Sequence, residues 1–97
     1  MRPVHWRVRD IATEMGHVLY DHLMHEDDFY KEWIRQTPGL TAKEREAYFV
    51  HRNLSRLIPQ ARATLTTMMI ETTDDALRED IYDALLLDAT LVRGRAN

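Results

Sequence analysis

The sequence predicts an all-α protein, a small antiparallel bundle of three helices whose second helix is kinked or split at Pro59. Apolar residues recur with the 3.6-residue period of a helix along most of the chain, and no pair of alternating segments suggests a β-hairpin. Breaks at Pro38-Gly39 and at Thr72-Thr73 leave three segments of helical length. The 97 residues allow one hydrophobic core, so we expect a single domain over residues 1–97.

The first predicted helix covers roughly residues 4–36. Its apolar stripe consists of Val8, Ile11, Met15, Val18, Leu19, Phe29, Tyr30 and Trp33. Pro3 suits a first helical turn, because its missing N–H would have no partner there in any case. Apolar and polar residues also alternate before position 9, as they do in a strand. Residues 1–10 therefore either begin the helix, which we favour, or form an extended arm that ends at an N-cap on Asp10.

The second predicted helix covers residues 42–70. It begins with a capping box, in which the Thr41 hydroxyl accepts a backbone N–H and the Glu44 carboxylate reaches back to the N-cap. Pro59 interrupts it, because proline lacks an N–H and its ring clashes with the preceding turn. We expect either a bend or two shorter helices there.

The third predicted helix covers residues 74–93. Thr72 to Asp75 supply a cap and negative charge in the first turn, which the helix dipole favours. Gly94 is suited to ending the helix.

Composition narrows the classes of function. The chain contains no cysteine, which excludes disulfides, thiolate metal sites and thiol nucleophiles. No run of about 18 apolar residues occurs, so we expect no membrane partner and a cytoplasmic location. No nucleophile elbow, phosphate loop or HExxH motif occurs, so we expect no enzymatic activity and no cofactor.

Four ionisable residues occupy positions that the helical period assigns to the interior or its edge. His22 and Glu26 lie within the apolar stripe of the first helix, and Asp88 lies within that of the third. His51 lies at the edge of the stripe of the second helix. In an antiparallel bundle these side chains would form one buried polar layer that either fixes the register, faces a cavity or interface, or binds a metal.

Other residues are predicted to point outward and to contact a partner. Apolar and arginine side chains fall outside the predicted core. These partner-binding candidates are Tyr20, Met24, Arg45, Phe49, Arg52, Arg56, Leu86 and Leu87. The arginines and Phe49 form a basic stripe on the second helix that could hold phosphates and stack a base, or contact an acidic protein.

These observations favour a non-enzymatic protein–protein interaction module, such as a small adaptor, inhibitor or assembly subunit. Its partner would be another protein or a second copy of itself, forming an oligomer. One alternative is a metal-binding bundle that uses the histidines and carboxylates. Another is nucleic-acid binding through the basic stripe, which the net charge of −3 opposes.

Overall fold

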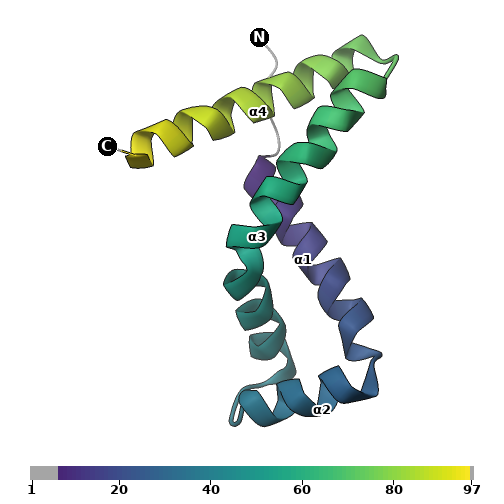
Figure 1. Ribbon diagram of the computed structural model, residues 1–97, viewed down its shortest axis with the longest axis vertical. Coiled ribbons are helices and arrows are strands. Elements are labelled where there is room, and N and C mark those ends of the chain that lie inside the picture. The colour runs from purple at the N-terminus through teal and green to yellow at the C-terminus, as the bar shows by residue number, and fades with distance from the viewer. Residues whose placement is uncertain (1–6, 97) are drawn as a thin grey trace.

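The computed structural model describes the backbone of residues 7–96 and the side chains of residues 7–89. Within that range the chain forms four helices and no strand, so the all-α class is confirmed and the count of three helices is wrong. The helices are α1 (Val8–Met24), α2 (Asp27–Gln36), α3 (Ala42–Glu71) and α4 (Asp75–Ala96) (Figure 1). Arg7 is extended and is the N-cap of α1, so a helix that runs on through Arg7 and an N-cap at Asp10 are both wrong, and Asp10 is the third residue of the helix. The segment before position 7 lies outside the described residues.

The first predicted helix is divided at His25 and Glu26. Glu26 has an extended conformation (φ −90°, ψ 117°) and is the N-cap of α2. Asp27 and Asp28 follow in the first turn of α2, where carboxylates interact favourably with the positive end of the helix dipole. This acidic run and the polar residues His22 and Glu26 within the apolar stripe are local signals for the break. Because of it, α2 turns away and bridges the ends of α1 and α3 (Figure 1).

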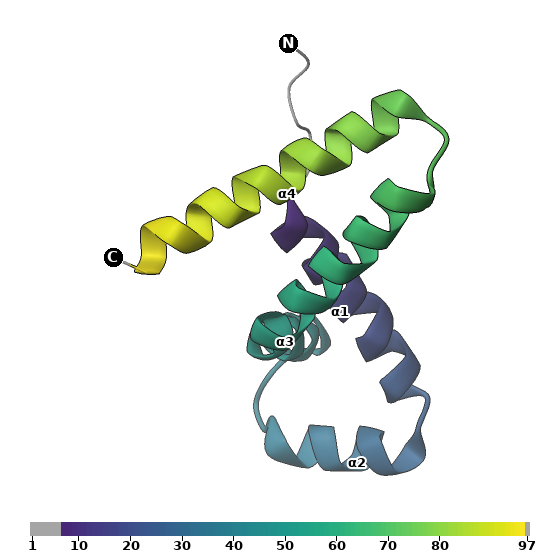
Figure 2. The same ribbon diagram turned by 45° about the horizontal axis from the view of Figure 1, so that its top comes forward.

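The capping box at the start of α3 is confirmed. The Thr41 hydroxyl accepts a hydrogen bond from the Glu44 N–H at 3.2 Å, and the Glu44 carboxylate accepts one from the Thr41 N–H at 2.9 Å. Pro59 lies inside α3, which is continuous, so the helix is not split there. The ribbon of α3 changes direction about halfway along (Figure 2), as expected of a helix with an internal proline.

The core begins with a close contact between α1 and α3. The residues of α1 that are buried are Val8, Ala12, Gly16 and Tyr20, spaced four apart. A Cβ atom added to Gly16 would lie 3.1 Å from Leu57 Cδ1 and 3.1 Å from Val50 Cγ1. Small side chains on α1 therefore let the two helices approach closely, and this face is buried rather than the larger apolar stripe.

Helix α4 continues to Ala96, so the predicted end of the third helix at Gly94 is wrong. It packs across the upper part of α3 and touches the start of α1. Its Ile81 and Ala84 are almost fully buried, and Ile81 joins Val8 and Leu65 in one cluster. The chain has a radius of gyration of 16.4 Å, against about 13 Å for a compact domain of this length. Figure 1 shows why: α4 runs on past α3 instead of folding down beside it.

Candidate functional site

The predicted buried polar layer does not form. His22, Glu26 and His51 are all exposed. Because α1 ends at Met24, Glu26 no longer belongs to that helix. The face of α1 that carries Ala12 is the one buried against α3, so His22, on another face, is exposed. Asp88 is the only one of the four that is partly buried.

Asp88 pairs with an arginine, and not with the other residues of the predicted polar layer. Its carboxylate accepts a hydrogen bond from the Arg62 Nε–H and forms an ion pair that joins α4 to α3. The Asp88 side chain is 16% exposed and that of Arg62 is 40% exposed. This ion pair sets the position of α4 on α3 and leaves no unpaired charge at Asp88.

Two of the predicted partner-binding residues are part of the core. Tyr20 and Phe49 are each 6% exposed, and their ring centroids lie 5.2 Å apart. Trp33 from α2 meets Phe49 edge-on, and Met24 packs beside them, half-buried. Burial raises the pKa of the Tyr20 hydroxyl above its ordinary value. The prediction that Tyr20 and Phe49 point outward was wrong because α2, which covers them, was not predicted as a separate helix.

The remaining candidates differ in exposure. Arg45 is half-buried and donates hydrogen bonds to the Thr37 hydroxyl and carbonyl, which closes the end of α2. Leu87 is half-buried and Leu86 is 54% exposed. Arg52 and Arg56 are exposed, so only these two arginines of the predicted basic stripe are available to a ligand.

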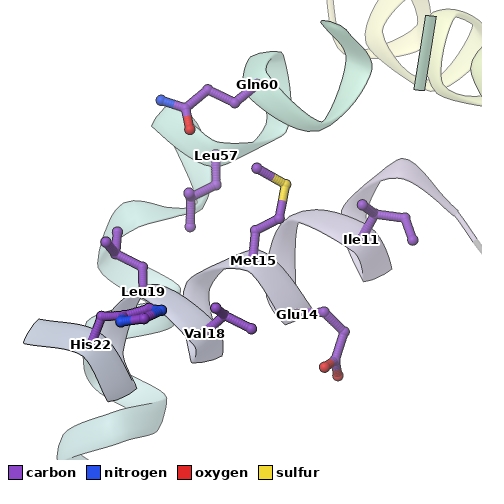
Figure 3. A pocket seen from close by; sticks show the side chains of 8 residues that line it. All are labelled: Ile11, Glu14, Met15, Val18, Leu19, His22, Leu57 and Gln60. Carbon is purple, nitrogen blue, oxygen red and sulfur yellow. The ribbon is translucent and has the colours of Figure 1, made fainter. Parts of the chain in front are cut away.

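Four residues of the predicted apolar stripe, Ile11, Met15, Val18 and Leu19, line an open hollow between α1 and α3, whereas Val8 and Trp33 of the same stripe are buried as predicted. We call this hollow the α1 groove. Its volume is about 480 Å³, and its lining residues are Ile11, Glu14, Met15, Val18, Leu19, His22, Leu57 and Gln60. Val18 is 58% exposed and Leu19 is 39% exposed. Figure 3 shows Met15 and Leu57 pointing toward each other from the two helices, whereas Glu14 points away.

The sequence contained a signal for this groove that hydrophobic periodicity overlooks. Ala12 and Gly16 are small residues one turn apart, which favour close packing of a helix against its neighbour. Ile11, Met15, Val18 and His22 then follow the 4-3-4 spacing of a seam between two helices. Val18 on this seam is 58% exposed, whereas Ile11 and Met15 also pack against the core cluster.

A second hollow lies next to the α1 groove and carries positive charge. Its volume is about 400 Å³, and its lining residues are Phe29, Trp33, Gln36, Phe49, Arg52, Asn53, Ser55 and Arg56. Arg56 precedes the groove residue Gln60 by one helical turn, so the two hollows are neighbours along α3. None of the ion pairs in the described part of the chain involves Arg52 or Arg56. We call these two residues the arginine pair.

The described residues offer few other groups that could bind a metal or a membrane. Within residues 7–89, no group of three or more histidine and carboxylate side chains is placed to hold a metal ion. One histidine and one carboxylate do meet: His17 Nδ1 lies 2.6 Å from Glu46 Oε2, and this contact joins α1 to α3. No helix in the described range is long and apolar enough to cross a membrane. The metal alternative therefore loses its ligand set, and the nucleic-acid alternative loses its stacking residue, because Phe49 is buried.

Comparisons with protein-family models, with curated proteins and with solved structures found no match to this chain.

Proposed function

We propose that this chain is a non-enzymatic protein–protein interaction module and that the α1 groove is its binding surface. One observation carries the proposal: Val18 and Leu19 are exposed, at 58% and 39%, beside a groove lined mainly by apolar side chains. Single exposed apolar residues are common on proteins. A contiguous apolar groove is uncommon, and such grooves mark sites where a partner binds.

The shape of the groove favours a helical partner. Two helices form its walls, and the residues along α1 have the 4-3-4 spacing that accepts side chains of a neighbouring helix. An amphipathic helix could place its apolar face in the groove, a common mode of peptide recognition. Glu14, His22 and Gln60 would lie at the rim and meet the polar edge of that helix.

Site-specific photo-crosslinking tests this proposal. A photoreactive phenylalanine analogue is placed at position 18 in the groove or, as a control, at position 30. Tyr30 on α2 is 48% exposed and does not line the groove. The two proteins are irradiated in cells of the native host, and covalent adducts are identified by mass spectrometry.

The proposal predicts one dominant protein adduct at position 18 that is weak or absent at position 30. The adduct should disappear when Leu19→Lys is added, because a lysine charge would have to be buried on binding. Equal labelling at positions 18 and 30, or no adduct at position 18, would contradict the proposal.

A further inference from the structure

The chain exposes more surface than a compact monomer of its mass. Its accessible surface is 7380 Å², whereas a monomer of 11.5 kDa is expected to expose about 5,800 Å². A stable protein–protein interface of standard size buries about 800 Å² on each partner. The exposed surface is large enough to supply an interface of that size on every copy.

Helix α4 carries a second surface whose chemistry complements the groove. Glu79, Tyr82, Asp83 and Leu86 follow the i, i+3, i+4, i+7 spacing that places residues on one side of a helix. Tyr82 is 55% exposed and Leu86 is 54% exposed, whereas Ile81 and Ala84 face the core. We call these four residues the α4 ridge; it alternates acidic and apolar side chains.

The negative charges of the α4 ridge complement the positive charges beside the α1 groove. The α1 groove offers apolar contacts, and the arginine pair lies beside it along α3. Arg52 and Arg56 form no ion pair within the described residues, so their charges are available to a partner's carboxylates. Arginine forms two parallel hydrogen bonds with a carboxylate, which gives such a contact direction.

We infer that the occupant of the α1 groove is the α4 ridge of a second copy of this chain, an inference that rests on the proposed function. Tyr82 and Leu86 of one copy pack against Val18 and Leu19 of the other, and the carboxylates meet the arginine pair. In a twofold-symmetric dimer each copy contributes one groove and one ridge, so the contact forms twice. The two contacts together cover the apolar surface that the elongated monomer leaves open.

Reversing the charges on each side of the contact provides the test. One variant carries Arg52→Glu and Arg56→Glu, and the other carries Glu79→Arg and Asp83→Arg. A third, Lys31→Glu with Lys43→Glu, reverses two exposed charges outside both hollows and serves as the control. Masses are measured by light scattering after size-exclusion chromatography at about 100 µM protein, where an interface of standard size should be occupied.

The inference predicts that the wild type and the lysine control have the mass of two copies. Each reversed variant alone should be at least tenfold weaker in self-association, because like charges then face each other in both contacts. An equimolar mixture of the two reversed variants should recover the mass of two copies, since each contact regains opposite charges. Circular dichroism confirms that helix content is unchanged, and Glu79→Arg alone replaces the ridge variant if the half-buried Asp83 cannot be reversed.

Three results would overturn the inference: a monomeric wild type, a dimer that neither reversal weakens, or a mixture that stays monomeric. The crosslinking experiment separates this failure from failure of the proposed function. A monomeric chain that captures a different protein at position 18 disproves the second copy as partner and leaves the groove as the binding surface. The absence of any adduct specific to position 18 disproves the groove itself.

Discussion

Replacing Gly16 should reveal how closely α1 and α3 approach each other. A Cβ at this position would lie 3.1 Å from Leu57 Cδ1 and 3.1 and 3.3 Å from the two methyl carbons of Val50. Carbon atoms in contact normally lie about 3.5–4.0 Å apart. Leu57 and Val50 are both 4% exposed, so neither has free space into which it can withdraw.

Two opposing contributions set the magnitude. Alanine in place of a helical glycine gains about 1 kcal/mol from the lower backbone entropy of the unfolded chain. Adding a methyl group to a filled core costs about 1–3 kcal/mol. Gly16→Ala should therefore lower the free energy of unfolding by about 1 kcal/mol. Gly16→Val adds two further carbons and loses most of the propensity gain, so it should cost about 3 kcal/mol.

Urea denaturation followed by far-ultraviolet circular dichroism measures these differences, with Val50→Ala as the companion change. In a Val50→Ala background two of the three close contacts are gone, and Gly16→Ala should become stabilising by about 1 kcal/mol. This reversal of sign is the diagnostic result. If Gly16→Ala stabilises the protein equally in the wild-type and Val50→Ala backgrounds, then the two helices do not approach as closely as the structure shows.

Further predictions concern the caps and ion pairs. Thr41→Ala should lower the free energy of unfolding by about 1 kcal/mol in urea titrations, because the first turn of α3 loses a hydrogen-bond acceptor. Hydrogen bonds from the Thr41 N–H and, to a lesser extent, from the Thr41 hydroxyl hold the pKa of Glu44 below its ordinary value of 4.5, and Thr41→Ala removes the second of these. That stabilisation is complete above pH 4.5 and disappears as the pH falls through the folded pKa, so NMR titration of the Glu44 carboxyl should show a midpoint below 4.5 that returns toward 4.5 in Thr41→Ala. The Glu32 carboxyl should titrate with a pKa of about 2, because neighbouring arginine and glutamine side chains donate to its carboxylate. Asp88→Asn should cost about 1 kcal/mol by losing the charge that faces the half-exposed Arg62, and a matching Arg62→Met should remove that difference.

Much of the fold follows from local sequence. The capping box at Thr41, the start of α4 after Asp74 and the position of Pro59 within a bent helix were all predictable, because caps and proline act on a few neighbouring residues. The break at Glu26 was harder to predict. Its local signals are a short acidic run and two polar residues, His22 and Glu26, at positions of the apolar stripe, and the stripe resumes at Phe29 beyond the break.

The candidate site could not be predicted in the same way. Hydrophobic periodicity assigned Val18 and Leu19 to the core, because an apolar stripe that faces a neighbour in the same chain looks identical to one that faces a partner. The same reasoning placed Tyr20 and Phe49 on the surface, although α2 covers them. His22, Glu26, His51 and Asp88 shared a layer only under the assumption of three straight helices.

The sequence alone therefore determined that this chain is helical and where α3 and α4 begin, since these properties depend on interactions within one or two turns. Only the tertiary structure decided which face of α1 is buried. The close approach allowed by Ala12 and Gly16 brought that face against α3 and left the larger apolar side chains open, because burial depends on which surfaces fit together as well as on how apolar each one is.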